Sequence, residues 1–289
     1  MRQFLHFIFA LCALLPVACV TSPSTPPHTG ADLTSSPVTT DLAGASAMSS
    51  RLAVVRVRCA STHKAGTAFL HQSGRYITAA HVIEGCPQGG LQLINASGAS
   101  TSASAFALDF DRDLGLLTPA ENLAGIPLRL AAQGTTPTLG SLLSTWGFPD
   151  GYSGFPPLLC VGYFSGSELV RLDPGKSPRR QYVVNGAFNH GNSGGPILLI
   201  ESGVVVGVVS NKLQPFPENI ASVLKALKAQ KSGFVYTRTF NDGHQEQVSE
   251  GQIIAEVLDF LRAQTQLVVG RAVTLSDLRE FLQSHGLAP

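Results

Sequence analysis

Three side chains in this sequence, His81, Asp113 and Ser193, are of the types that together activate a hydroxyl group for acyl transfer. A serine hydroxyl is a weak nucleophile by itself, so an adjacent base must take its proton as it attacks a carbonyl carbon. A histidine titrates near neutral pH and suits that role. A carboxylate would hold the imidazole in the right tautomer and stabilise its protonated form. The sequence therefore contains the groups that nucleophilic hydrolysis requires.

Ser193 stands in the segment HGNSGGPILLI (190–200), which permits three interpretations. Gly, Asn, Ser and Pro are common in turns, so the segment could be a turn without chemistry. Residues 191–195 also fit G-x-S-x-G, the nucleophile elbow of the α/β-hydrolases. That elbow needs a helix directly after the serine, whereas the strand-like GVVVGVVS (203–210) follows here. The elbow is therefore disfavoured, and the third interpretation, a serine loop between strands of a β-barrel, depends on the rest of the chain.

His81 and Asp113 each stand beside an apolar segment. His81 follows two small residues in RYITAAHVI (75–83), and Asp113 directly precedes LGLLTP (114–119). The order His, Asp, Ser is that of the chymotrypsin fold. The separations of 32 and 80 residues suit a first barrel that carries the histidine and the aspartate, and a second barrel that carries the serine.

Short apolar segments alternate with turn signals from Arg51 onward. The strand-like segments include RLAVVRVRC (51–59), GTAFLH (66–71), LGSLLSTWGF (139–148), LLCVGYF (158–164), QYVVNGAF (181–188) and PILLI (196–200). Many short strands at close spacing predict an all-β barrel or sandwich rather than βαβ units. Apolar residues spaced i, i+3, i+4 predict late helices at 219–230, 251–264 and 274–285.

Four motifs together resemble those of the trypsin-like serine peptidases, and especially of the bacterial Deg (HtrA)-type branch. They are GTAFL (66–70), TAAH (78–81), RDLGLL (112–117) and GNSGGP (191–196). The resemblance covers residues 51–210 and implies an all-β, chymotrypsin-like double β-barrel with late and C-terminal helices. It implies a first barrel at about 51–125 and a second at about 126–289. It also implies catalytic roles for His81, Asp113 and Ser193, with the backbone N–H groups of Gly191 and Ser193 as the oxyanion hole.

The resemblance leaves the end of the second barrel open. LVVGRAVTLSDLREFL (267–282) resembles the final strand and helix of a Deg-type domain, which would make 212–266 an insertion. Alternatively, SGFVYTRTF (232–240) is the last barrel strand and two helices are appended. We expect no PDZ domain, which many Deg proteases carry.

The specificity pocket of the family is walled by the segment before the serine and by a strand edge after it. Here these positions correspond to Ala187, Phe188, Ser210 and Asn211. Trypsin-like specificity needs an aspartate at the position of Ala187, and a buried cation without one is strongly unfavourable. We therefore expect a basic P1 residue to be rejected. Phe188 either narrows the pocket in favour of small apolar residues or points into the barrel core.

The predicted function is that of an exported serine endopeptidase that forms an acyl-enzyme and acts on polypeptides. The alternatives are a weak or inactive protease-like binding module, and an esterase that uses the same triad. A formal net charge of +1 gives no basic surface for nucleic acid, and no Cys/His/Asp/Glu cluster has metal-ligand spacing. We expect no cofactor, no metal, and membrane contact only through an N-terminal lipid.

The N-terminus predicts export. An apolar run, FLHFIFALCALLPVA (4–18), is too short to span a bilayer comfortably and indicates a signal peptide at 1–18. Cys19 stands where a bacterial lipoprotein would be lipidated, although Pro16 departs from that motif. Residues 19–50 are rich in Ser, Thr and Pro and predict a disordered tether. We expect a periplasmic lipoprotein, with the outer membrane as destination, or otherwise a secreted protein.

The remaining cysteines fit an oxidising compartment. Chymotrypsin-like enzymes often have a disulfide beside the histidine strand, so the resemblance favours a Cys59–Cys86 bridge with Cys160 free and buried. Alternatively, all three are reduced.

Several other titratable residues lie near the motifs. We interpret Asp109 and Asp111 as solvated residues of a polar turn. We expect His63 and His71 to lie on the surface and His190 to be a loop residue.

Overall fold

The structure is a computed structural model that describes residues 49–87, 89–171, 175–212, 218–231, 233–240, 243–264 and 268–289. The predicted signal peptide, Cys19 and the tether up to residue 48 lie outside the described residues. The folded part includes Ser50, which is 4% exposed and precedes the short helix η2 (Arg51–Ala53). Trp146 donates a hydrogen bond from Nε1 to Ser50 Oγ (3.1 Å), so the chain is already packed against the domain at this residue.

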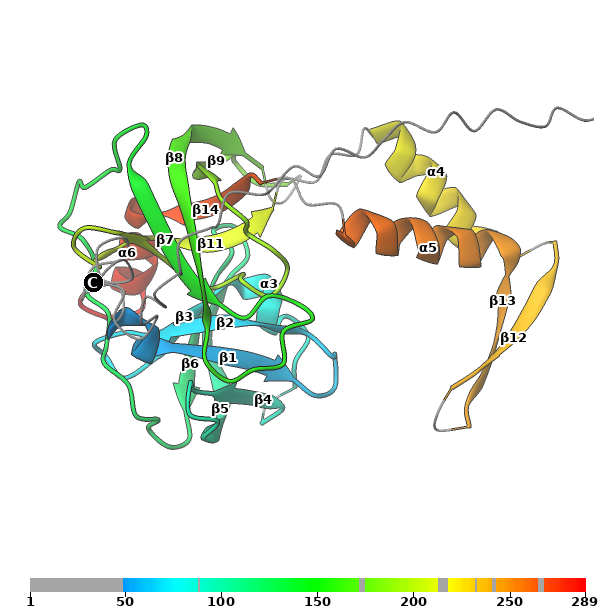
Figure 1. Cartoon of the computed structure of the whole chain (residues 1–289), viewed down its shortest axis with the longest axis horizontal. Helices are drawn as coiled ribbons and strands as arrows, with labels where there is room; N and C mark the ends of the chain where they lie inside the picture. The colour runs from blue at the N-terminus through cyan, green and yellow to red at the C-terminus, as the bar shows by residue number, and fades with distance from the viewer. Residues whose placement is uncertain are drawn as a thin grey trace, which may run out of the picture. The chain divides into compact units, whose positions relative to one another are not determined.

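The first barrel consists of six antiparallel strands in the closed order β1-β2-β3-β6-β5-β4 (Figure 1). They are β1 (Val54–Cys59), β2 (Ala65–Leu70), β3 (Tyr76–Thr78), β4 (Leu91–Ile94), β5 (Ser100–Asp109) and β6 (Leu114–Pro119), with helix α3 (Ala80–Ile83) after β3. Val57, Phe69, Ile77, Leu93 and Leu116 come from five different strands and are all fully buried. Branched and aromatic side chains at inward positions therefore fill this barrel.

The second barrel also has six antiparallel strands, in the closed order β10-β11-β14-β9-β8-β7. They are β7 (Leu142–Gly147), β8 (Leu158–Val170), β9 (Arg179–Asn185), β10 (Pro196–Leu199), β11 (Val205–Lys212) and β14 (Gly270–Thr274), and helix α6 (Leu275–Ser284) follows β14. Two six-stranded antiparallel barrels with later helices form the chymotrypsin-like fold, which confirms the predicted fold class.

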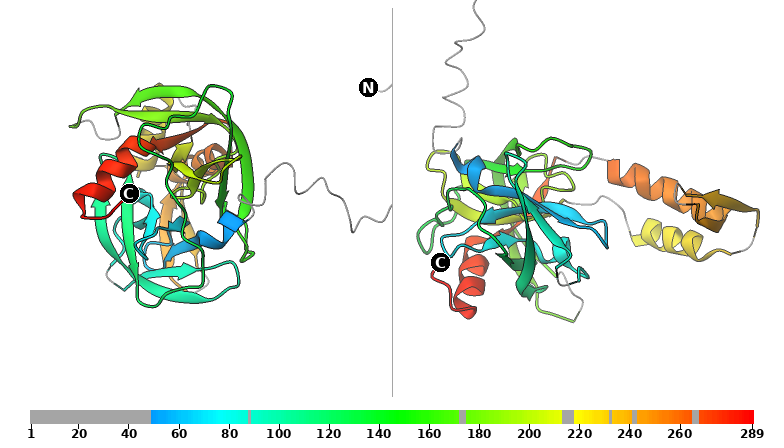
Figure 2. Two further views of the ribbon diagram at one scale, coloured as in Figure 1. Left: turned by 90° about the vertical axis from the view of Figure 1, so that its left-hand side faces the viewer. Right: turned by 90° about the horizontal axis from the view of Figure 1, so that it is seen from below.

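Helix α6 begins with a side-chain cap, since Thr274 Oγ1 accepts a hydrogen bond from the Asp277 N–H (3.2 Å). Its buried residues Leu278, Phe281 and Leu282 join the apolar cluster that fills the first barrel. The helix therefore lies across the junction of the barrels (Figure 2), although it directly follows a strand of the second.

Residues between β11 and β14 form a separate set of elements, which we call the lobe. It contains α4 (Glu218–Ala229), β12 (Val235–Thr239), β13 (Gln245–Ser249) and α5 (Glu250–Gln264). β12 and β13 pair with each other as a two-stranded sheet, whereas β14 pairs with both β11 and β9. The last barrel strand is thus β14, and the strand within 232–240 belongs to the lobe. None of the helices among the described residues is long and apolar enough to cross a membrane.

The cysteines pair as predicted. Cys59, at the end of β1, and Cys86, after α3, form a disulfide, and Cys160 is free. Cys160 is only partly buried rather than fully so, and that burial raises the pKa of its thiol.

Candidate active site

His81 and Asp113 are in direct contact. His81 is the second residue of α3, and Asp113 ends the turn between β5 and β6. His81 Nδ1 lies 2.9 Å from both Oδ1 and Oδ2 of Asp113, and the His81 backbone N–H donates to Oδ1 (3.1 Å). Asp113 is 7% exposed. This arrangement fixes the proton on Nδ1 and leaves Nε2, on the opposite edge of the ring, as a base.

Ser210 is a further group on this carboxylate. Its side chain is fully buried on β11, and its Oγ donates to Asp113 Oδ2 at 2.6 Å. Sequence reasoning placed Ser210 in the substrate pocket and missed this contact. No sequence signal marks it, because a serine at the end of GVVVGVVS is equally compatible with either face of a strand.

Ser193 and His81 line the same open pocket, which has a volume of about 360 Å³. The other residues that line this pocket are His63, Lys64, Ala65, Val82, Glu84, Asp150, His190 and Gly191. In the structure Ser193 Oγ donates to the backbone carbonyl of Ser210 (2.8 Å), and within the described ranges no hydrogen bond joins it to His81. The hydroxyl therefore shares the pocket with His81 but is bonded to the Ser210 carbonyl instead of to the imidazole.

Glycine is required on both sides of Ser193. Gly191 and Gly194 have φ values of +90° and +86°, which side chains rarely adopt. A Cβ on Gly191 would lie 2.2 Å from the Phe148 carbonyl oxygen, and one on Gly194 would lie 2.1 Å from that of Thr67. The backbone of β2 in the first barrel and the backbone just after β7 thus lie too close to the serine loop for any residue other than glycine at these two positions.

Thr67, on β2, holds the serine loop from the first barrel. Its N–H donates to the Ser193 carbonyl (2.9 Å), and its Oγ1 donates to the Gly191 carbonyl (2.7 Å). The same Oγ1 accepts from the Phe148 N–H (3.2 Å). The segment GTAFL therefore contributes more than a strand, because its threonine bridges the two barrels at the nucleophile.

Two backbone N–H groups of the serine loop donate no hydrogen bond within the described part of the chain. Asn192, Gly194 and Gly195 donate to carbonyls of Asn189, Val209 and Asn192, at 2.7 to 3.1 Å. The N–H groups of Gly191 and Ser193 have no acceptor in the part of the chain that the structure describes. The Asp150 N–H binds the His190 carbonyl (2.8 Å), which turns the Gly191 N–H to the opposite side of that peptide. Two donors are therefore available for an anionic oxygen.

The four residues predicted to form the specificity pocket occupy different environments, and Ser210 directly contacts Ser193 through its backbone carbonyl. Phe188 is 4% exposed and belongs to the core of the second barrel, where it packs so closely on Gly270 that a Cβ there would lie 2.1 Å from its ring. Ala187 is half-buried, and its carbonyl accepts from Asn192 Nδ2 (3.4 Å). Asn211 pairs with Arg271 across β11 and β14, and its side chain lies outside the described part. Of the two interpretations of Phe188, the structure shows the one in which it points into the core.

The histidines outside the triad differ in exposure. His63 and His190 are exposed and line the pocket. The expectation that His71 lies on the surface is wrong, because it is 1% exposed, and burial lowers the pKa of its imidazole. The backbone of His71 forms an isolated bridge to Leu128, in the segment before the second barrel. Among the described residues, no group of His, Cys, Asp and Glu is arranged to hold a metal ion.

Comparisons with known proteins agree with this geometry. Residues 66–208 match the family model of the trypsin-like peptidase domain. The chain therefore carries a trypsin-like peptidase domain, and the predicted family resemblance is confirmed. A comparison with curated proteins finds no match.

Solved structures of similar fold include HtrA-type and related proteases. The inactive form of the Rv3671c protease is 16% identical, with a TM-score of 0.56 over 86% of this chain and 95% of that chain. The active form of the same protease, from M. tuberculosis, is 18% identical, with a TM-score of 0.52 over 83% and 93%. The HtrA-type protease AlgW with a tripeptide is 18% identical, with a TM-score of 0.54 over 84% and 64%. At these identities the similarity shows the fold.

Proposed function

We propose that this chain is a serine endopeptidase that cleaves polypeptides with Ser193 as nucleophile, His81 as general base and Asp113 as the carboxylate that orients it. The observation that carries the proposal is the bidentate contact of Asp113 with His81 Nδ1, in the pocket that also contains Ser193. The match of this region to the trypsin-like peptidase domain supports it.

The reaction begins with a rotation of the Ser193 side chain. Its hydroxyl leaves the Ser210 carbonyl and turns towards His81 Nε2, a rotamer change that is fast compared with turnover. As Ser193 Oγ attacks the peptide carbonyl, its proton passes to His81 Nε2, and Asp113 stabilises the imidazolium. The proton then passes to the leaving amine, and an acyl-enzyme remains on Ser193. Water, activated by the same imidazole, releases the acid.

The two free N–H groups stabilise the tetrahedral intermediates. As the substrate carbonyl becomes an oxyanion, the N–H groups of Gly191 and Ser193 donate to it. Such donors act where charge develops, and one of them typically contributes a factor of about 10²–10³ to kcat. Thr67 and Asp150 hold the loop in the orientation that presents these donors.

The finer proposals concern location and specificity. We propose that the protein is exported through a signal peptide at 1–18 and is lipidated at Cys19, as a periplasmic protein of the outer membrane. The Cys59–Cys86 disulfide supports export, because disulfides persist in oxidising compartments. Rejection of basic P1 residues is supported by Ala187, which stands at the position where trypsin-like specificity needs an aspartate.

The proposal is tested with a fluorophosphonate probe and with two kinds of substrate. We expect the wild-type protein to be labelled and to hydrolyse casein, and we expect Ser193→Ala to lose both properties. Ser202→Ala is the matched control, because Ser202 is exposed in the turn between β10 and β11. An unlabelled, folded wild-type protein would indicate a binding module instead. Labelling with turnover of a short-chain ester but not of casein would indicate an esterase.

A further inference from the structure

Asp113 has an unusual backbone conformation. Its φ is +58°, and apart from His63 it is the only residue other than glycine with a positive φ in the described part of the chain. A side chain is strained in this region, so the surrounding contacts must impose the conformation. The carboxylate itself meets His81 and Ser210, but these contacts do not hold the turn that leads into Asp113.

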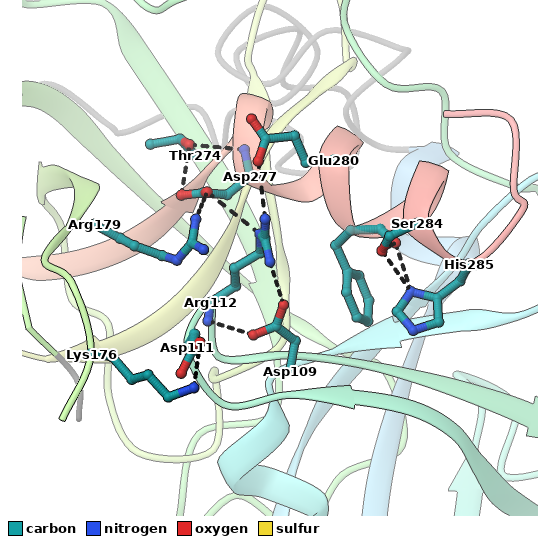
Figure 3. Close-up of polar contacts among 11 residues, drawn as sticks. Asp109, Asp111, Arg112, Lys176, Arg179, Thr274, Asp277, Glu280, Ser284 and His285 are labelled. Carbon is teal, nitrogen blue, oxygen red and sulfur yellow. Dashed lines mark hydrogen bonds and ion pairs between the residues drawn. The ribbon is translucent and has the colours of Figure 1, made fainter.

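Arg112, the preceding residue, is bound by carboxylates from two elements (Figure 3). Its backbone N–H donates to Asp109 Oδ1 (3.0 Å), and its Nη1 donates to Asp109 Oδ2 (2.6 Å), which closes the turn. Its Nη2 donates to Glu280 Oε2 (3.0 Å), and its Nε lies 3.6 Å from Asp277 Oδ1, both on α6. Asp109 is therefore not a freely solvated turn residue, as the sequence suggested, but part of this network.

The α6 end of the network is fixed independently. Asp277 also accepts from Arg179 Nη1 of β9 (2.9 Å), and its own N–H is bound to the cap residue Thr274. The side chains of Arg112 and Asp277 are only 21% and 13% exposed, so their attraction is weakly screened. The neighbouring α6 residue Leu278 is fully buried. Arg112 thus ties the aspartate turn to a helix that cannot easily move.

We propose that Arg112 is a positioning residue for catalysis, which holds the turn so that Asp113 keeps its contacts with His81 and Ser210. The inference rests on the proposed function. The Arg112 guanidinium binds Asp109, Asp277 and Glu280 rather than the Asp113 carboxylate, so it acts through the backbone of the turn and not as a charge on the triad. Without it the strained conformation of Asp113 can relax, and the carboxylate leaves His81 Nδ1.

Positioning and charge predict opposite effects on the pH profile. If Asp113 moves away, the imidazolium loses stabilisation, and the acid limb of kcat/KM moves to lower pH. If Arg112 acts as a nearby positive charge, its removal would favour the imidazolium and move the limb to higher pH. The other charged groups near the His81 backbone, Lys64 and Glu84, are the same in all variants below.

The test compares Arg112→Gln with Arg112→Lys and with Arg180→Gln. Arg180 is the matched control, because its guanidinium binds only the exposed Ser167 hydroxyl among the contacts of the described residues. For Arg112→Gln we expect kcat to fall about 10- to 100-fold, the range expected from a displacement of about 1 Å, with KM within about twofold and the acid limb at lower pH. Arg112→Lys should recover only part of kcat, because an ammonium cannot bridge the carboxylates as a guanidinium does.

A second variant, Asp109→Ala, and an NMR measurement test the proposal independently of Arg112→Gln and of peptidase activity. If Arg112→Gln does not fold, Asp109→Ala, which removes two of the turn contacts, should give the same changes in kcat and pH profile. The NMR resonance of the proton between His81 Nδ1 and Asp113 should move upfield or broaden in both variants, whether or not the protein cleaves peptides. A protein without peptidase activity would thus refute the proposed function and leave this resonance to decide the role of Arg112. Wild-type kcat and an unmoved resonance in Arg112→Gln, or an acid limb at higher pH, would overturn the inference.

Discussion

Replacing Thr67 with valine should damage the serine loop without changing the shape of the core. Valine has nearly the same volume as threonine, but it lacks the hydroxyl that binds the Gly191 carbonyl and the Phe148 N–H. The backbone bond from Thr67 to Ser193 is retained. The substitution therefore leaves two buried backbone groups without a hydrogen bond.

The cost follows from the burial of these groups. Thr67 is fully buried and Phe148 is 4% exposed, so water cannot replace the lost bonds easily. Each unsatisfied buried group costs about 1–3 kcal/mol, so the two groups together give a loss of roughly 2–6 kcal/mol in the free energy of unfolding. For a domain of this size, Tm should fall by about 2–4 °C per kcal/mol, and thus by roughly 4–24 °C in total. Because the Gly191 carbonyl is no longer held from the first barrel, the serine loop should also lose alignment, and kcat should fall about tenfold or more.

Thr67→Ser is the matched control, because it keeps the hydroxyl and removes one methyl group. It should cost about 1 kcal/mol and leave kcat close to the wild-type value. Both variants are measured by thermal unfolding and by peptide hydrolysis per titrated active site. If the valine and serine variants have the same Tm and kcat, the bridging role of Thr67 is wrong.

Three further predictions concern other contacts. Ser210→Ala removes a hydrogen bond to the Asp113 carboxylate, and a bond of this kind to a charged acceptor contributes about 1.5–3 kcal/mol. We therefore expect kcat/KM to fall roughly 10- to 100-fold. An unchanged kcat/KM at equal active-site concentration would contradict this prediction. Burial lowers the pKa of His71, so the wild-type protein should lose stability as pH falls below about 6.5, the ordinary pKa of a histidine. Urea unfolding at several pH values should show this loss for the wild type and not for His71→Leu. The same dependence of stability on pH in both proteins would refute the prediction. Replacing Cys59 and Cys86 with serine opens a loop with a sequence separation of 27. In denaturant titrations the free energy of unfolding should fall by about 3–4 kcal/mol, and a fall below about 1 kcal/mol would contradict this prediction.

The parts of the site that could be predicted from sequence are those with a local signature. His81 follows a strand, Asp113 precedes one, and Ser193 stands among glycines whose positive φ values and close backbone contacts allow no other residue. Each of these signatures lies in the sequence directly adjoining the residue. The order and separation of the three segments, together with the family resemblance, then predicted two barrels.

The contacts that sequence reasoning missed depend on registers between distant segments. Ser210 reaches Asp113 across 97 residues, and Arg112 reaches Glu280 across 168. His71 is buried and forms an isolated bridge to Leu128, although its own neighbours, Gln and Ser, are typical of an exposed turn. In each case the local pattern is compatible with a solvated residue, and only packing between segments decides otherwise.

The late position of β14 determines when this fold can become complete. β14 lies between β9 and β11 in the second barrel, yet the whole lobe stands before it in the chain. The lobe adds little to the cost of closing this loop, because closure entropy grows only by about 0.6 kcal/mol for each doubling of length. It does make the closing contacts non-local, and such contacts form slowly.

A nascent chain therefore contains His81, Asp113 and Ser193 well before it contains the elements that lock them. Until β14 has been synthesised, the second barrel has an open edge on both β9 and β11. Until α6 follows, Arg112 has only Asp109 of its own turn to bind. The order of the elements along the chain thus delays the completion of the site, because His81, Asp113 and Ser193 reach their final arrangement only when α6 has docked.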